Sequence, residues 1–288
     1  MPYLYLVLAT VGVASTNIVA GFYNRKNASE KNTASLYTFL VQATIFLCWL
    51  VMFLFDRTYD WAVLPYALLF AVSFAMCMIG NIYALKTGPV VLTSLALQLS
   101  LVGVTAWGFI FWDTKFTWLT AVGLVLIVVS LWLCLYNGKH EEKKINWKWI
   151  VFALMAFVGN AGASITQRTQ QTNFAGQYGN FLMVVATFLA AAICFVLYLF
   201  SEKGDTKKLV KTSWYYPVAG GAMNVMLNVC VILLATSTLS PSIIYPVLAV
   251  GGLIIVTVFS KYVFKEDMRW WQWLGVIIGT IAVGILSI

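Results

Sequence analysis

Long segments without a charged residue follow one another along the chain, separated by short charged segments. The uncharged segments cover residues 2–24, 32–55, 61–85, 87–112, 116–138, 149–167, 169–201, 212–260 and 270–288. Continuous apolar runs of this length are typical of membrane-spanning helices, which need about 20 residues, whereas the strands of a membrane barrel alternate over about ten. The segment 212–260 is long enough for two helices, and Ser237, Thr238, Ser240 and Pro241 break it near its middle.

The pattern therefore predicts ten transmembrane helices joined by short loops. They are expected near residues 3–23, 35–55, 61–85, 89–112, 117–136, 148–168, 178–200, 214–236, 241–263 and 269–287. The first is expected to be a retained span rather than a signal peptide, because it has no basic n-region and no convincing cleavage site. The largest loops, 24–34, 137–147 and 201–212, have only 11 or 12 residues each, so no soluble domain is expected.

Composition strengthens this prediction. Of the 288 residues 61% are hydrophobic and only 10% are charged, and the mean hydropathy is +0.87. An ordinary soluble domain has about 25% charged residues. A water-soluble fold of this size could not cover so much apolar surface, which excludes a cytosolic enzyme, a secreted disulfide scaffold and a disordered chain. The chain is therefore expected to be an all-α polytopic membrane protein.

The net charge of +8 raises the question of nucleic acid as a partner. All 18 Lys and Arg residues, however, lie near the ends of apolar segments and form no basic stripe. Anionic membrane lipids are therefore the expected partner, and no nucleic acid is expected. Most tryptophans, Trp112 among them, also lie near the predicted helix ends, where they are expected to anchor the chain at the membrane interface.

A weak internal repeat divides the chain into two halves. Residues 88–94 align with 240–246 at an offset of 152, and the same offset places Gly123 on Gly275. The predicted domains are a first five-helix repeat over 1–138, a charged connecting loop over 139–147 and a second five-helix repeat over 148–288. Because five is an odd number, the two halves must enter the membrane from opposite sides. An inverted repeat of this kind, around a central cavity, is a common plan of secondary transporters.

The stretch from Leu234 to Gly284 resembles the second half of EamA-type proteins of the drug/metabolite transporter superfamily. The similarity lies in a proline inside the ninth helix (Pro246), an aromatic–Lys–Glu turn that ends at Glu266, and a glycine nine residues later (Gly275). In the first half, YALKTGPVVLTS at 83–94 is similar to the junction between the third and fourth spans, but the turn has Asp113 or Thr114 where a Glu is typical. The resemblance implies ten helices, a 5+5 inverted repeat and a central cavity. It implies no single substrate, because members move amino acids, sugars, nucleotides and amphiphilic compounds.

All ten Asp and Glu residues lie in the predicted loops or at helix ends. A carboxylate inside the membrane is the usual proton or cation relay, so its absence is evidence against antiport through a membrane-embedded Glu. No nucleophile with a base and no cluster of metal ligands is present, so no enzyme activity, cofactor or metal is expected. Arg168 is placed at the end of the sixth helix, where it is either an interfacial anchor or a group that attracts a carboxylate or phosphate.

The candidates for substrate contact are therefore neutral. A polar side chain inside a membrane needs a partner, so each should face another helix or a wet cavity. Asn224 and Asn228 are four residues apart, share one helix face and form the leading candidate pair. For each single residue, helix packing and substrate contact both remain open. The full set is Asn17, Gln42, Asn81, Gln98, Asn160, Gln167, Asn224, Asn228 and Tyr245.

These features predict a secondary transporter that moves a small polar or amphipathic organic metabolite by alternating access, through facilitated diffusion or exchange. The alternative is a membrane scaffold or receptor that reuses the fold without transport. A bacterial cytoplasmic membrane is the expected location. The loops after the odd-numbered helices hold 15 of the 18 basic residues, so the positive-inside rule places these loops in the cytoplasm and both termini outside.

Overall fold

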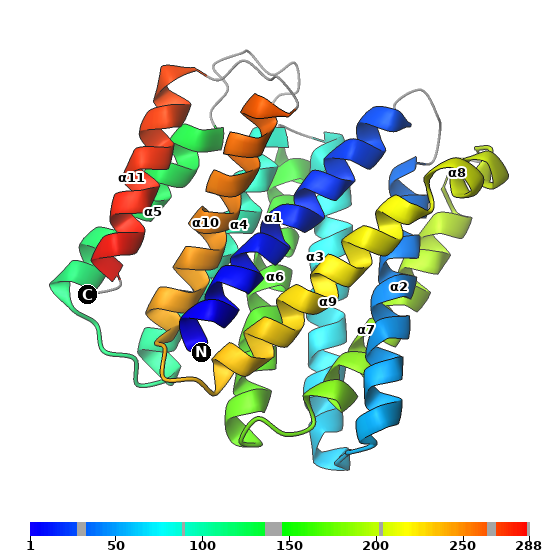
Figure 1. Cartoon of the computed structure of the whole chain (residues 1–288), viewed down its shortest axis with the longest axis horizontal. Helices are drawn as coiled ribbons and strands as arrows, with labels where there is room; N and C mark the ends of the chain where they lie inside the picture. Colours follow the sequence, from blue (N-terminus) through cyan, green and yellow to red (C-terminus); the bar gives the residue numbers. More distant parts are fainter. Residues whose placement is uncertain (28–32, 88–89, 136–145, 202–203, 264–268, 287–288) are drawn as a thin grey trace.

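The structure, a computed structural model, describes residues 1–27, 33–87, 90–135, 146–201, 204–263 and 269–286. In these residues the chain forms eleven α-helices and one 3₁₀ helix, η1 (Trp61–Val63), arranged as one bundle (Figure 1). Ten of the α-helices correspond to the ten predicted from the sequence. The α-helices are α1 (Pro2–Lys26), α2 (Thr33–Asp56), α3 (Leu64–Thr87), α4 (Val90–Phe111), α5 (Trp118–Leu135), α6 (Trp147–Asn173), α7 (Gly179–Leu199), α8 (Thr206–Ser213), α9 (Tyr215–Ala235), α10 (Pro241–Tyr262) and α11 (Trp270–Leu286).

By length and composition, seven helices in the described part of the chain can cross a membrane, namely α1, α2, α3 with η1, α6, α7, α9 and α10. Three further apolar stretches there are shorter, at Ala96–Phe111, Trp118–Cys134 and Trp270–Ile285 in α4, α5 and α11. The long uncharged segment divides as predicted, because Ser240 caps α10 by accepting a hydrogen bond from the Ser242 backbone N–H and Pro241 starts the helix. The all-α polytopic membrane fold is therefore confirmed.

Two helix boundaries differ from the sequence prediction. The segment 201–212 was expected to be a loop, but it contains the short amphipathic helix α8, which Asp205 caps and which buries Leu209. Two helical turns are too short to stand out among apolar runs of 20 residues. The sixth helix was expected to end at 168, but α6 continues to Asn173 because the following turn satisfies its polar side chains. The Gln170 Nε2, for example, donates a hydrogen bond to the Gln177 carbonyl oxygen at 2.9 Å.

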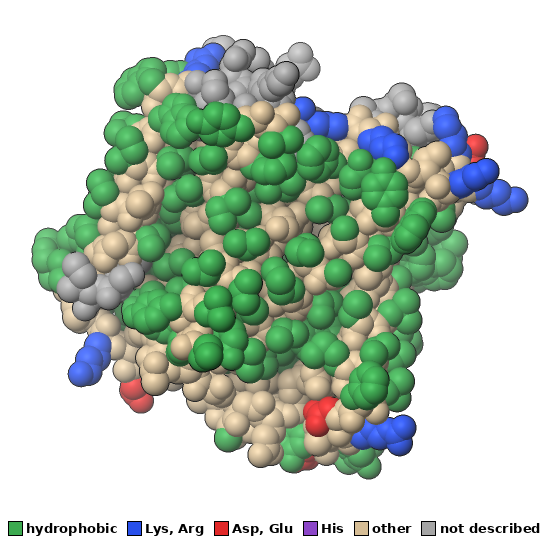
Figure 2. All heavy atoms as spheres, viewed as in Figure 1, with side chains coloured by type: hydrophobic (Ala, Val, Ile, Leu, Met, Phe, Trp, Pro, Cys, Tyr) green, Lys and Arg blue, Asp and Glu red, His purple; other side chains and the backbone are tan. Residues whose placement is uncertain are grey.

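The outer surface of the bundle is apolar. Large hydrophobic side chains are exposed on all ten long helices, including Phe55, Ile110 and Leu154. In Figure 2 they cover the middle of the visible face, while charged side chains gather at its two edges, with Lys and Arg most evident beside α8. A broad apolar surface of this kind would be unstable in water and is suited to lipid.

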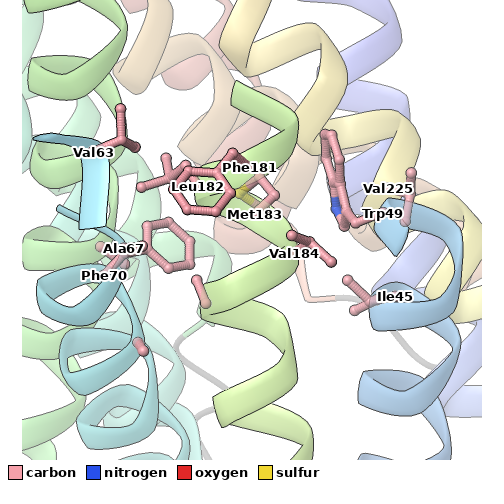
Figure 3. Packing of buried hydrophobic residues seen from close by; sticks show 13 residues of the cluster. Ile45, Trp49, Val63, Ala67, Phe70, Phe181, Leu182, Met183, Val184 and Val225 are labelled. Atoms are coloured by element: carbon pink, nitrogen blue, oxygen red, sulfur yellow. The ribbon is translucent and has the colours of Figure 1, made fainter. Parts of the chain in front are cut away.

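The main buried cluster is built around α7. Its residues 181–184 lie between Ala67 and Phe70 of α3 on one side and Trp49 of α2 on the other (Figure 3). Leu182 and Trp49 are almost completely buried. This packing joins helices from both predicted halves of the chain.

The contacts between helices repeat when the two halves are exchanged. The exchange matches α1, α2, α3, α4 and α5 with α6, α7, α9, α10 and α11, in that order. The contacting pairs α1–α9, α1–α10 and α2–α9 then become α6–α3, α6–α4 and α7–α3, and these three pairs are also in contact. The pairs α2–α7, α4–α10 and α5–α11 map onto themselves and are also in contact. Halves related by a twofold axis would produce this pattern. The connecting loop 139–147 lies mostly outside the described residues, so the division itself stays a prediction.

Small residues allow the closest of these approaches. A Cβ atom on Gly80 of α3 would lie 2.5 Å from the Ala156 backbone nitrogen of α6, and one on Gly159 would meet the α3 backbone at Ser73 equally closely. In α11, Gly275 accepts a hydrogen bond from the Ser130 hydroxyl of α5 at 2.7 Å. Glycine at these positions therefore permits close helix packing.

Candidate functional site

A cavity of about 470 Å³ lies between the helices of the two halves. Helices α1, α2, α3 and α4 contribute to its wall from the first half, and α6, α9 and α10 contribute from the second. Eight of the nine side chains that the sequence singled out line this one cavity. They are Asn17, Asn81, Gln98, Asn160, Gln167, Asn224, Asn228 and Tyr245.

Helical spacing explains why distant residues converge here. On α6 the lining residues are Asn160, Ala163, Ser164 and Gln167, which follow the i, i+3, i+4, i+7 pattern of a single face. On α9 the lining residues Asn224, Leu227, Asn228 and Val231 repeat the same pattern. Each helix therefore presents one mixed polar and apolar stripe to the cavity.

Three amides form a directed chain across α6 and α9. The Gln167 Nε2 donates to the Asn228 Oδ1 at 3.3 Å, and the Asn228 Nδ2 donates to the Asn224 Oδ1 at 2.9 Å. The Asn228 Nδ2 also donates to the Asn224 backbone oxygen at 2.9 Å. Asn228 thus uses its hydrogen-bonding groups within the protein, whereas the Asn224 Nδ2 has no acceptor in the described part of the chain. The chain of amides ends in a donor that faces the cavity.

A second polar contact joins α4 to α6. The Asn160 Nδ2 donates to the Ser100 Oγ at 2.6 Å and to the Leu97 backbone oxygen at 3.4 Å. These hydrogen bonds assign helix packing to Asn160, which is one of the two roles that the sequence left open for it. Asn81 and Gln98 line the cavity without a side-chain hydrogen bond to any described residue, so their amides are available to water or a ligand.

Gln42 does not belong to the cavity. It is buried in α2 outside the lining residues, and its Oε1 has no hydrogen-bond partner among the described residues. Of the two roles that the sequence left open for Gln42, its position outside the cavity favours helix packing. The sequence could not reveal this, because the face of α2 that meets the cavity is set by its packing against α7 and α9.

The cavity also has an apolar wall that the sequence reasoning missed. Phe70, Phe74 and Met78 of α3 line it together with Asn81. These residues lie three or four positions apart and so share one helix face with Asn81. The spacing from Asn81 in the sequence could therefore have identified them. A mixed wall of rings and amides is typical of pockets for small organic ligands.

A partly buried cation lies beside Tyr245 of the cavity wall, although the cation itself is not among the lining residues. Arg168 follows Gln167 on α6, and its guanidinium carbon is 5.2 Å from the centre of the Trp112 ring. The Trp112 ring stacks at 6.4 Å from the ring of Tyr245, which lines the cavity, interacts with Arg168 and donates a hydrogen bond to the Ser164 carbonyl oxygen at 3.5 Å. We call Arg168, Trp112 and Tyr245 the arginine–aromatic cluster.

The arginine–aromatic cluster adds to two expectations. Arg168 does not end its helix, because α6 continues for five more residues to Asn173. Trp112 contacts a cation and a tyrosine from the other half of the chain, so it does more than anchor the interface. Members of the cluster come from α6, from the end of α4 and from α10, and sequence alone could not place them together.

The cavity extends from the arginine–aromatic cluster toward the opposite ends of the helices. Tyr245 and Leu248, near the start of α10, are almost completely buried. Asn81, in the last two turns of α3, and Thr38, near the start of α2, line the cavity farther from the cluster, and Asn17 is exposed there. The cluster therefore lies at the more enclosed end, on the side of the α10 start and the α6 end.

Comparisons with known proteins agree with this architecture. Residues 1–136 match the EamA-like transporter family. No curated protein matches the chain. The crystal structure of another protein is similar to this chain with a TM-score of 0.74. The similarity covers 99% of this chain and 95% of the other, and the two sequences are 11% identical. At that identity the similarity shows a shared fold.

The matched residues end at the last helix of the first half. The stretch from Leu234 to Gly284, which first suggested the family, lies outside the match, while the described fold continues through α11. The resemblance to the drug/metabolite transporter superfamily is thereby confirmed for the first half of this multi-pass membrane protein, whose residues 1–136 match the EamA-like transporter family.

Proposed function

We propose that this chain is a secondary transporter that carries a small polar or amphipathic organic metabolite by alternating access between its two halves. The observation that carries the proposal is the convergence of eight neutral polar side chains, drawn from both halves, on one cavity of about 470 Å³. A site at the interface of two repeats is the arrangement in which rocking of the halves exposes a ligand to each side in turn.

The chemistry of the cavity favours facilitated diffusion or exchange. Its lining residues include amides, hydroxyls, rings and aliphatic groups but no Asp or Glu. Proton-coupled transport commonly uses a titratable carboxylate inside the membrane. The amide oxygens of Asn81 and Gln98 can still contribute to the binding of a neutral or charged ligand. We place the protein in the cytoplasmic membrane of a bacterium, with its basic loops toward the cytoplasm.

Reconstitution into liposomes tests the proposal directly. The purified protein is exposed to a panel of small metabolites, and binding is followed by thermal stabilisation while flux is followed with labelled compounds. We expect at least one compound to stabilise the protein and to exchange across the bilayer. Stabilisation without flux would favour the receptor alternative, and the absence of both would remove the support for transport.

A further inference from the structure

The arginine–aromatic cluster identifies a class of substrate, an inference that rests on the proposed transport function. We propose that the cavity selects small organic anions with an apolar body and an oxyanion group, and that Arg168 supplies the selecting charge. The oxyanion is a carboxylate or a phosphate, since both accept hydrogen bonds from a guanidinium in the same planar geometry.

The charge of Arg168 is not neutralised within the described structure. Arg168 is partly buried inside α6, and its interacting groups there are the Tyr245 hydroxyl and the Trp112 ring, with no carboxylate in an ion pair. Asp113, the neighbour of Trp112, is exposed. A cation inside a membrane protein without a paired anion is costly, and such residues usually line a substrate or ion pathway.

The cavity beside it offers no competing charge. Its lining residues are all neutral, and Arg168 is a formal charge that interacts with one of them, Tyr245. The interaction between two charges is much stronger in a partly buried site than in bulk water. An anion in the cavity is therefore attracted before any direct contact forms, whereas a cation is repelled.

The neutral wall suits the remainder of such a ligand. Phe70, Phe74 and Leu248 provide apolar contacts, and the free Nδ2 donor of Asn224 provides a hydrogen bond to an oxygen atom. No lining carboxylate is present to pair with an ammonium group. The arrangement thus favours an amphipathic acid over an amine of the same shape.

The cluster also links anion binding to the movement of the halves. Trp112 directly follows α4 of the first half, whereas Arg168 and Tyr245 belong to α6 and α10 of the second. Separation of α4 from α6 and α10 on this side would remove the Trp112 ring from Arg168. An oxyanion can then replace Trp112 and Tyr245 as the partner of the guanidinium, so the charge remains paired while the cavity opens.

Three ligands with one apolar body test the charge preference: 3-phenylpropanoate, 3-phenylpropanamide and 3-phenylpropylamine, with phenylethyl phosphate to separate carboxylate from phosphate. Binding to the purified protein is measured by thermal stabilisation and isothermal calorimetry, and flux is measured in liposomes. We expect an oxyanion to bind at least tenfold more tightly than the amide and the amine. Equal or better binding of the amide or amine overturns the proposal.

The variants Arg168→Gln and Arg168→Lys assign the preference to one residue. We expect Arg168→Gln to lose the tenfold preference while keeping the weak binding of the amide, and Arg168→Lys to keep part of it, because the charge remains but the planar donors are lost. Lys115→Gln removes an exposed cation from the same end of the molecule and should leave the preference for the oxyanion unchanged.

Two failures can be told apart. A folded Arg168→Gln protein that still prefers the oxyanion overturns the role of Arg168. Flux of the neutral amide without flux of either oxyanion overturns the substrate class but leaves transport intact, whereas the absence of binding and flux for every compound counts against transport itself.

Discussion

At the scale of single residues, the polar side chains in the cavity divide into those that hold the protein together and those that remain available. Asn228 accepts from Gln167 and donates to Asn224, so its amide is used within the protein. The Asn224 Nδ2 has no acceptor in the described residues and faces the cavity. Two asparagines on one helix face, which looked equivalent in the sequence, are therefore expected to have different roles.

This difference can be measured with leucine substitutions. Replacing both Asn224 and Asn228 by Leu should abolish or strongly reduce transport while the protein still folds, since Leu suits the apolar surroundings. Asn224→Leu alone should weaken binding about 3- to 10-fold, the value of one hydrogen bond. Asn228→Leu should also lower the melting temperature, because it leaves the Gln167 amide without its acceptor.

Gln42→Leu is the matched control. It makes the same change at a buried amide outside the cavity, where the Oε1 has no partner among the described residues. We expect unchanged transport and equal or higher thermal stability. Normal kinetics in the double Asn224 and Asn228 variant would remove these residues from the site, and a variant that fails to fold would assign them to helix packing.

At the scale of helices, glycines set how closely α3 approaches α6. The backbones meet at Gly80 and Gly159, where an added Cβ would contact backbone atoms of the other helix rather than a flexible side chain. Backbone atoms cannot move aside without shifting the whole helix. Because α3 and α6 both line the cavity, a change in their separation alters its shape as well as the stability of the bundle.

A pair of identical substitutions tests this dependence. Gly80→Ala should destabilise the protein by about 1–3 kcal/mol, the usual cost of overpacking, because its Cβ would lie 2.5 Å from the Ala156 nitrogen. Gly284→Ala in α11 meets no atom within 4 Å and should be neutral or slightly stabilising, since Ala favours helix more than Gly. Thermal unfolding in detergent compares the two, and equal melting temperatures would contradict the role of the close approach.

At the scale of the whole molecule, the two halves meet at α4 and α10 beside the arginine–aromatic cluster. A Cβ on Gly108 of α4 would lie 3.4 Å from the Cβ of Pro241 at the start of α10. This separation is close to that of a disulfide, whose Cβ atoms lie about 3.5–4.5 Å apart. A crosslink here would hold the enclosed end of the cavity in its present arrangement.

Alternating access predicts that this crosslink stops transport. In a background without the five native cysteines, oxidation of the double variant Gly108→Cys and Pro241→Cys should reduce flux at least tenfold, and a reducing agent should restore it. Each single variant, treated with the same oxidant, provides the control. Full flux with a formed crosslink would show that the two halves need not separate at this position.

The orientation of the chain in the membrane can be measured with one described residue on each side of the bundle. The basic loops follow the odd-numbered spans, and Arg168 now belongs to a helix interior, which leaves only Arg57 and Lys115 in the loops of the other side. With these loops in the cytoplasm, a cysteine at the exposed Lys207 of α8 should resist an impermeant thiol reagent in intact cells. A cysteine at the exposed Gln177 should react, and the opposite pattern would reverse the orientation but not the fold.

The sequence by itself determined which parts of this chain are helices and that they belong in a membrane. Uncharged runs of 20 residues have few alternatives in lipid, because only a helix satisfies every backbone hydrogen bond within its own segment. The break at Pro241 was equally local, since proline is favoured at the first position of a helix and the preceding Ser240 caps it. Most of the polar residues around the cavity could also be named in advance, because amides are rare and costly in apolar helices and must find polar surroundings.

Only the tertiary structure decided how these residues are used. Gln42 and Gln98 are both amides in apolar helices, yet packing buries one outside the cavity and leaves the other in its wall. Asn224 and Asn228 differ only because α6 places Gln167 beside Asn228. Arg168 and Tyr245 lie on two helices of the second half, and Trp112 directly follows a helix of the first. No local pattern predicts contacts between side chains that are 56 and 77 residues apart. Such contacts depend on how whole helices pack, which is why the charge that we propose selects the substrate could be recognised only in the folded molecule.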